Sequence, residues 1–373
     1  MRIENMMLYM MGILFFNILI YIKVDKYKYF IVVLFDIIFS IMIATTNCAD
    51  YGSYEWIYSY AGQISNMDGF FESRYYSMGN IEPGYLLSNK IAYELGMLFF
   101  EFRYVLYCAC LFMIFLSVHK HCKNIFWVMF LYMIYPMLID VIQIRNFVTD
   151  VILLLALGIL HSSAINKMKY ILLIVIGMTF HAISFAYILV LPVYQFIDKL
   201  SKKIIWIVFI IMVLTGYIFM NQDNLREVML LAAIAFERGS SYFEDSIGIR
   251  QCFSNIIMLA LVIVSYWANY VKKINSDFCK SVHALNMLMF FVSPLFLLDS
   301  ETSRLVRACL LPNYILWAMC IEKISKFSYR LCIYSIFTFL VVGYMCMNFL
   351  FGVGLEQIPM IINNNEIINL LLF

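Results

Sequence analysis

Long apolar runs separated by short polar connectors dominate this chain and restrict what it can fold into. Of its 373 residues, 64% are hydrophobic and only 13% are charged, which is far less charge than a soluble domain carries. In a lipid bilayer every backbone N–H and C=O group must be hydrogen-bonded within the protein, so only helices and closed barrels can cross it. Runs of this length favour helices. We therefore expect an all-α fold, a polytopic helical bundle that forms a single membrane domain over residues 1–373.

Twelve runs have the character of membrane-spanning helices. They cover residues 6–22, 29–47, 102–118, 124–139, 145–161, 168–182, 184–197, 204–220, 252–270, 282–298, 304–321 and 331–350. No small-residue cleavage site follows the first run, so we expect a retained helix rather than a signal peptide. The apolar stretch 84–100 ends without a lysine connector. A full crossing there would invert every later loop, so we expect a re-entrant or interfacial segment.

The lysines predict the orientation of these helices. Fifteen of the sixteen lysines fall in six short connectors, at residues 23–28, 120–123, 167–169, 199–203, 272–280 and 323–326. Placing all six connectors in the cytoplasm orients the twelve runs without conflict. The outer face then receives two long loops, 48–101 and 221–251. The second contains an amphipathic stretch, Leu225–Phe236, which we expect to lie along the membrane interface.

Arginine is distributed differently, and its chemistry points to an anion on the outer face. Nine of the ten arginines lie on that side. The planar guanidinium matches pairs of phosphate or carboxylate oxygens, whereas lysine is a hydrated point charge. Four arginines are candidate diphosphate ligands: Arg145 at the tip of a predicted hairpin, Arg238 in the second outer loop, and Arg304 and Arg307 at a helix start.

Arg304 and Arg307 are three residues apart, which places them on one face of a helix and suits a diphosphate clamp. For all of these arginines except Arg238 the structural alternative is a local salt bridge; for Arg238 it is anchoring at the membrane interface. The acidic neighbours available for salt bridges are Asp140 and Asp150 for Arg145, and Asp299 and Glu301 for Arg304 and Arg307.

His181 is the one histidine of five that this topology places on the outer side. It lies at the tip of a hairpin over residues 168–197, whose arms of about fifteen residues are short for a hydrocarbon core of roughly 30 Å. We therefore expect the imidazole in a recess below the outer surface. There it could act as a general base or hold a phosphate. The structural alternative is a histidine hydrogen-bonded to a neighbouring helix.

The first outer loop combines aromatic rings with carboxylates, a mixture that suits sugars. Ring faces can stack on a sugar, and carboxylates can accept hydrogen bonds from its hydroxyls. An interfacial aromatic belt is the alternative. The candidate sugar-binding residues are Tyr51, Tyr54, Trp56 and Tyr85, and the candidate catalytic carboxylates are Asp50 and Glu82.

Several site classes have no support in the sequence. It contains no glycine-rich nucleotide loop, no metal-ligand spacing and no G-x-S-x-G motif, so we expect neither a metal nor a cofactor. The basic connectors are short and scattered, so we do not expect nucleic acid as a partner. The ten cysteines form no C-x-x-C pair and lie mostly inside apolar runs, which is typical of buried residues.

The order of these features resembles the EpsG-like branch of the Wzy-type polysaccharide polymerases. The resembling pieces span most of residues 48–243. They are Asp50-Tyr51…Tyr54…Tyr58, Glu82-Pro-Gly-Tyr85, Gln143-Ile-Arg145-Asn146, Phe180-His181-x-x-Ser184 and Phe236-Glu-Arg238-x-x-x-Tyr242. Asn146 stands where the pattern suggests a further polar residue such as glutamine.

The resemblance implies a multi-pass enzyme of the bacterial inner membrane that acts in O-antigen, capsule or exopolysaccharide synthesis. Such an enzyme transfers a growing glycan from undecaprenyl diphosphate to a sugar hydroxyl of an incoming lipid-linked repeat unit, at the periplasmic or outer face. Its partners would be that lipid-linked oligosaccharide, the bilayer and a chain-length regulator protein. The arginines would hold the diphosphate, and His181, Asp50 or Glu82 would accept the proton.

Two other functions fit an outer-face anion site. One is a polyprenyl-phosphate-sugar glycosyltransferase of the GT-C type, or a glycan ligase. The GT-C enzyme would need an acidic metal site, for which Asp50 is the one plausible seed. The other is a lipid-linked oligosaccharide flippase, which needs cations in a central cavity open alternately to both sides. The gathering of arginines on one side argues against a flippase.

Overall fold

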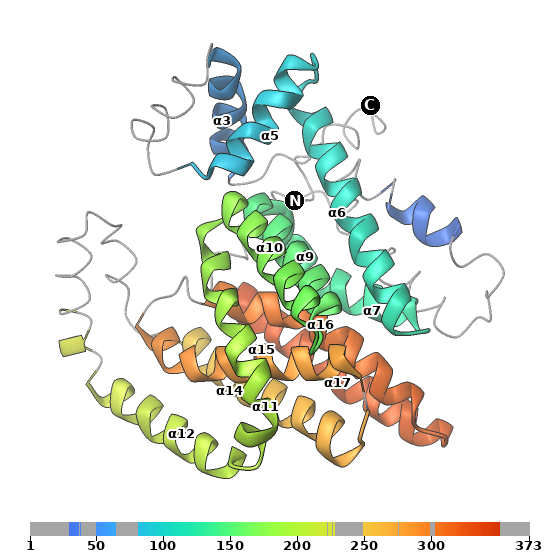
Figure 1. Cartoon of the computed structure of the whole chain (residues 1–373), viewed down its shortest axis with the longest axis vertical. Coiled ribbons are helices and arrows are strands. Elements are labelled where there is room, and N and C mark those ends of the chain that lie inside the picture. The colour runs from blue at the N-terminus through green and yellow to red at the C-terminus, as the bar shows by residue number, and fades with distance from the viewer. Residues whose placement is uncertain are drawn as a thin grey trace. The chain divides into compact units, whose positions relative to one another are not determined.

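The computed structural model describes residues 30–36, 38, 50–64, 81–221, 223–225, 227, 249–274, 276–298 and 303–350. Within these residues the regular structure is entirely helical, and no strand is present (Figure 1). The predicted all-α class is therefore confirmed. The predicted helix 6–22 and the amphipathic stretch 225–236, apart from residues 225 and 227, lie outside the described residues.

The chain divides into two compact units, which are described separately. Unit 1 takes in the described residues up to Ala156 and Met168–Ala186. Its helices are α3 (Tyr51–Gln63), α5 (Pro83–Glu94), α6 (Phe99–His121), α7 (Ile125–Ile134), α8 (Met137–Ile142), and most of α9 (Ile144–Ile159) and α10 (Ala164–Phe180).

Unit 2 takes in Leu157–Lys167 and the described residues from Tyr187 to Leu350. A 3₁₀ segment, η1 (Ala182–Leu189), runs from unit 1 into unit 2. The remaining elements of unit 2 are α11 (Val190–Ser201), α12 (Ile204–Met220), α14 (Ile249–Tyr266), the π-helical η3 (Trp267–Val271), α15 (Asp277–Val292), the 3₁₀ segment η4 (Ser293–Leu297), α16 (Ser303–Glu322) and α17 (Phe327–Leu350).

Six helical stretches among the described residues are long and apolar enough to cross a membrane. They are Phe99–His121, Ala182–Ser201, Gln251–Val271, Asp277–Leu297, Arg304–Glu322 and Phe327–Asn348. Each matches one of the twelve predicted runs. The count of twelve is not established, because the other described helices are shorter. The stretch Ala182–Ser201 has 20 residues, so this arm of the predicted hairpin is longer than expected.

The predicted run 124–139 is interrupted. α7 ends at Ile134 and α8 begins at Met137, with Pro136 between them. Proline has no N–H to donate and its ring clashes with the preceding helical turn, so a continuous helix is unfavourable there. The predicted runs 145–161 and 168–182 form α9 and α10, which have 16 and 17 residues.

In the first outer loop, α3 packs against α5 through one apolar face. Tyr54, Ile57, Tyr58 and Ala61 are buried on α3, and their spacing of three and four residues forms a single helical stripe. α5 has 12 residues, about 18 Å of helix, which is too short to cross a bilayer. A turn with Gly96 at φ 72° separates it from α6.

In unit 2 the lysine connectors come together at one end. Asp198, near the end of α11, accepts a hydrogen bond from the Tyr270 hydroxyl of η3 at 2.8 Å and pairs with Lys280 at the start of α15 at 3.6 Å. Asp277 also accepts from the Tyr194 hydroxyl at 3.0 Å and pairs with His161 at 3.0 Å. Three of the predicted connectors therefore lie on one side of this unit.

The centre of unit 2 is the helix pair α15 and α16, whose apolar windows are 78% and 89% buried. Asn286 and Asn313 join them through two amide hydrogen bonds, at 3.0 and 2.8 Å. Both side chains are fully buried. A buried amide without partners is costly, so this pair favours one register between the two helices.

We expect Asn286→Ala and Asn313→Ala each to destabilise the protein by about 1 kcal/mol, because each leaves the other amide without its partner. The double variant should lose less than the sum of the two, since both single changes break the same pair. Thermal unfolding in detergent measures this. Asn221→Ala is the matched control, because its amide bonds only to its own helix at Tyr217. Additive losses would contradict the expectation.

Candidate functional site

Glu82 stands immediately before α5 and is held by the start of that helix. It occupies the N-cap position with extended backbone (φ −65°, ψ 136°), and Pro83 follows in the first turn. Proline suits this position because it has no N–H to leave unpaired and its φ is already helical. The carboxylate does not cap its own helix, which leaves it available to residues from elsewhere in unit 1.

The first of these residues is Arg145, in the opening turn of α9. Its Nη1 forms a short ion pair with Glu82 Oε2, and both side chains are mostly buried. The guanidinium carbon also lies 5.8 Å from the centre of the Tyr54 ring, within cation–π range. Arg145 Nε is buried and has no hydrogen-bond partner among the described residues. The charge of Arg145 is therefore only partly compensated.

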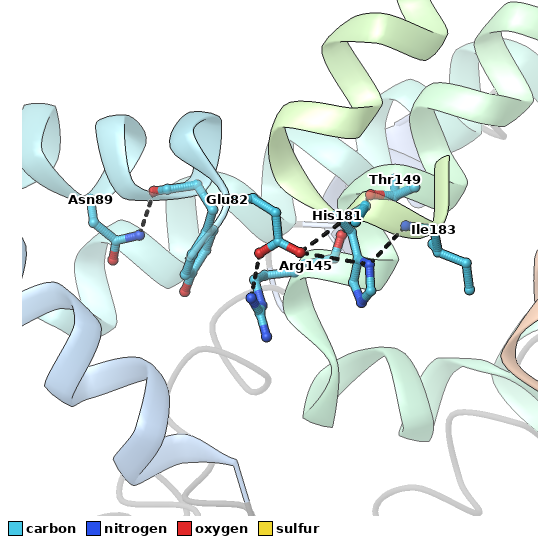
Figure 2. A network of polar contacts seen from close by, with 8 residues as sticks. Glu82, Asn89, Arg145, Thr149, His181 and Ile183 are labelled. Carbon is cyan, nitrogen blue, oxygen red and sulfur yellow. Dashed lines mark hydrogen bonds and ion pairs between the residues drawn. The ribbon is translucent and has the colours of Figure 1, made fainter. Parts of the chain in front are cut away.

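His181 contacts the same carboxylate from the end of α10. Glu82 Oε1 accepts a hydrogen bond from the Ala182 N–H at 3.3 Å and lies 3.8 Å from His181 Nδ1. Nδ1 in turn accepts the Ile183 N–H at 3.2 Å. A neutral imidazole in this geometry carries its proton on Nε2. Figure 2 shows Glu82 between Arg145 and His181, with contacts to both.

Two glycines allow this close approach. A Cβ atom built on Gly84 would lie 2.2 Å from Thr179 Oγ1 and 2.9 Å from the Thr179 carbonyl oxygen, and one built on Gly177 would lie 2.6 Å from Ser184 Oγ. Neither position accepts a larger residue unless the backbone moves. The start of α5 can therefore reach the end of α10, which is what brings Glu82 to His181.

Of the residues predicted from the sequence, the structure thus brings together Glu82, Arg145 and His181, which come from three separate segments. The alternative for Arg145 was a pair with Asp140 or Asp150, but the ion pair that forms is with Glu82. Asp140 instead accepts a hydrogen bond from the Tyr132 hydroxyl at 3.1 Å, and its carbonyl accepts from Tyr107 at 3.0 Å.

The candidate sugar-binding residues divide into buried and exposed rings. Tyr85 is fully buried, and Tyr54 packs edge-on against it with ring centres 5.7 Å apart. Tyr51 packs against Phe99 at 5.2 Å. Trp56 is 49% exposed and stacks flat on Tyr60, with centres 5.2 Å apart. Trp56 alone of the four presents a large exposed ring face.

Arg103 is a charged residue that the sequence reasoning did not single out. It is 2% exposed in the first turns of α6, with its guanidinium 5.0, 5.8 and 5.9 Å from the rings of Tyr51, Phe99 and Tyr107. Burial raises the pKa of the Tyr85 hydroxyl, while Arg145 and Arg103 both act to lower it. Tyr85 therefore lies within electrostatic range of both arginines. An arginine inside an apolar run is the signal that would have identified Arg103.

The remaining candidates lie elsewhere or outside the described residues. Arg304 and Arg307 occupy the first turns of α16 in unit 2, where Arg307 is 4% exposed. Asp50 stands just before α3 without capping it through its side chain. Arg238, Asp299 and Glu301 are not among the described residues. In the part of the chain that is described, no group of three His, Cys, Asp or Glu side chains could hold a metal ion.

Comparison with known proteins identifies the family. The model of the EpsG family matches residues 26–359, which is most of the chain. The chain therefore belongs to the EpsG family, and the predicted family resemblance is confirmed. With its six apolar helices it is a membrane protein of polysaccharide biosynthesis. No curated protein and no solved structure matches it.

We expect Gly84→Ala to displace the first turn of α5 from α10, because the added methyl group would overlap Thr179. Overpacking of this kind costs about 1–3 kcal/mol, which thermal unfolding in detergent would detect. Gly52→Ala on α3 is the control, since a Cβ there meets nothing within 4 Å. Equal stability of Gly84→Ala and wild type would show that the close approach does not constrain the site.

Proposed function

We propose that this member of the EpsG family is a polysaccharide polymerase. It transfers a growing glycan from undecaprenyl diphosphate to a sugar hydroxyl of an incoming lipid-linked repeat unit, at the outer face of the bacterial inner membrane. The observation that carries the proposal is the joining of Glu82, Arg145 and His181 in one contact network. A carboxylate, a guanidinium and an imidazole supply the groups that such a transfer needs.

In the reaction the bond between the anomeric carbon and the diphosphate oxygen breaks, and the acceptor oxygen forms a new bond to that carbon. The electron pair of the broken bond stays on the diphosphate, and the acceptor hydroxyl loses its proton to a base. A positioned arginine stabilises the negative charge that builds on the leaving group. Because diphosphate leaves readily, the proposal requires neither a metal nor a general acid.

Arg145 is the proposed diphosphate ligand in unit 1. Its charge is held by Glu82 on one side, while Nε lacks a hydrogen-bond partner. An incoming diphosphate would compete with Glu82 for the guanidinium. His181 supports the same role, because a neutral ring whose Nδ1 accepts the Ile183 N–H presents an N–H at Nε2, which suits a phosphate oxygen.

Glu82 is then the best candidate for the base. In the present geometry both of its oxygens are engaged, one by Arg145 and the other by the Ala182 N–H. Diphosphate binding to Arg145 would free Oε2 to accept the proton of the acceptor hydroxyl. Asp50 has no comparable contact with Arg145 or His181 among the contacts described above, and it stays an alternative base.

Two further groups complete the proposal. Arg304 and Arg307, three residues apart at the start of α16, would hold a diphosphate in unit 2 as a pair. Trp56 would stack against a sugar ring through its exposed face, with Tyr60 fixing the plane of the indole. The buried Tyr54 and Tyr85 would instead hold the guanidinium of Arg145 in place.

We expect Arg145→Ala, Glu82→Gln and His181→Ala each to lower the polymerisation rate at least about a hundredfold, the usual effect of removing a group that stabilises transition-state charge or moves a proton. The measurement is polymer formation by the purified protein from a lipid-linked repeat unit. Glu94→Gln is the matched control, because Glu94 is an exposed carboxylate on the same helix, paired only with Lys90 in the ion pairs described.

A deletion strain tests the reaction class. A polymerase deletion should leave single repeat units on the cell surface, whereas loss of all surface glycan would indicate a flippase. Polymer of normal length in all three variants would overturn the proposed site.

Arg145→Lys separates paired oxygen binding from simple charge. Lysine keeps the positive charge but cannot bind two oxygens side by side. We expect it to keep the protein folded and to leave polymerisation close to the level of Arg145→Ala. Steady-state rates at saturating repeat unit measure this. Recovery of wild-type rates would show that charge alone suffices at this position.

A further inference from the structure

An apolar groove lies in unit 2 on the helices α12 and α14. It has a volume of about 410 Å³, within the range typical of ligand sites. Its walls are the second half of α12, from Ile211 to Phe219, the first half of α14, from Cys252 to Leu259, and Phe290 and Leu297. Of the 17 residues of α12 only Ile211 is buried, so this helix packs loosely against its unit.

The chemistry of the groove favours a hydrocarbon chain. Nine of its eleven lining residues are apolar or glycine. Thr215 donates its hydroxyl to the Ile211 carbonyl at 2.8 Å, and the Asn255 amide nitrogen donates to the Gln251 carbonyl at 3.1 Å. Asn255 Oδ1 has no partner, but a single acceptor cannot orient a sugar or a phosphate. The groove therefore offers a large apolar surface and almost no polar recognition.

The helix register places this groove at the depth of two arginines. α15 and α16 run antiparallel, because Asn286 bonds to Asn313 and Cys279 Sγ lies 3.9 Å from Met319 Sδ. Continuing that register places Phe290 opposite residue 309 of α16. Arg307 is then about 3 Å away along the helix axis, at a rise of 1.5 Å per residue.

The same reasoning applies to α14. Ser265 contacts His283, and Asn286 bonds to the Leu261 carbonyl, so the groove residues Cys252–Leu259 lie opposite positions 289–296 of α15. The groove thus covers the depth of both Arg304 and Arg307. It lies at the end of unit 2 opposite the contacts of Asp198 with Tyr270 and Lys280, which join the lysine connectors.

We propose that this groove binds the isoprenoid tail of the lipid-linked substrate, with its diphosphate at the depth of Arg304 and Arg307. The inference rests on the proposed function for the identity of the tail. Charge complementarity supports this occupant, because an amphiphile with a long apolar tail and a doubly phosphorylated head matches an apolar groove level with two arginines. An uncharged lipid would use only the groove.

Gly216 provides a direct test. It lines the groove, and a Cβ built on it meets nothing within 4 Å. Gly216→Trp would therefore fill the groove without overlapping the protein at its first atom. Gly343→Trp is the matched control, because Gly343 also meets nothing within 4 Å, belongs to the same unit and lies on α17 outside the groove.

The probe is undecaprenyl diphosphate with a photoactivatable diazirine in its tail, presented to the whole protein in nanodiscs. On wild type we expect labelled peptides from Ile211–Phe219 and Cys252–Leu259. Gly216→Trp should reduce labelling about tenfold, since excluding two methylene-sized groups from apolar contact has that effect on affinity. Gly343→Trp should label like wild type. Gly216→Leu is a smaller substitution for use if Gly216→Trp does not accumulate.

The outcomes separate this inference from the proposed function. Labelling elsewhere, equal labelling of Gly216→Trp and Gly343→Trp, or full competition by phosphatidylglycerol would overturn the groove as the tail site. Labelling as expected in a protein that makes no polymer would support the groove and overturn the polymerase. Polymer synthesis by a wild-type protein whose groove is never labelled would overturn the groove alone.

Discussion

The ion pair between Arg145 and Glu82 is the contact on which the rest of the candidate site depends. Both side chains are mostly buried, and a buried charge without a partner costs several kcal/mol. The pair therefore links the start of α9 to the segment before α5, although 63 residues separate them in sequence. Glu82 then reaches the end of α10 through Ala182 and His181. One carboxylate determines the relative positions of three helix ends.

Small residues make that arrangement possible, and aromatic rings surround it. The start of α5 passes close to Thr179 because Gly84 has no side chain. Tyr54 and Tyr85 fill the space beside Arg145 and shield it from water. A low local dielectric strengthens each charge interaction inside such a site. The same shielding that makes the ion pair necessary would make Arg145 effective against the charge of a diphosphate.

Unit 2 is organised by a different constraint, the need to pair polar groups inside an apolar bundle. The amides of Asn286 and Asn313 bond to each other, and His283 lies between the hydroxyls of Ser201 and Ser265 at 3.1 and 2.8 Å. These contacts set the register of α14, α15 and α16. That register in turn places the groove beside α12 at the depth of Arg304 and Arg307, a relation that follows from helix geometry alone.

Much of this protein could be predicted from its sequence, because burial in a bilayer constrains composition directly. The apolar runs predicted the all-helical class and the positions of six spanning helices. The separation of lysine from arginine predicted that connectors meet at one end, as they do in unit 2 around Asp198 and Asp277. Glu82, Arg145 and His181 were all among the predicted candidates. The interruption at Pro136 and the 20-residue stretch Ala182–Ser201 were not predicted, since helix ends depend on packing as well as on hydrophobicity.

What the tertiary structure alone decided is which candidates meet. Sequence placed Arg145 near Asp140 and Asp150, but side-chain direction and the close approach at Gly84 bring Glu82 to it instead. Sequence treated Tyr54, Trp56 and Tyr85 alike, yet helix phase buries two of them and exposes the third. The proton position on His181 follows from the Ile183 N–H, a backbone contact with no signature in residue type. Hydrophobicity is a property of each residue and can be read along the chain, whereas pairing depends on distances across it.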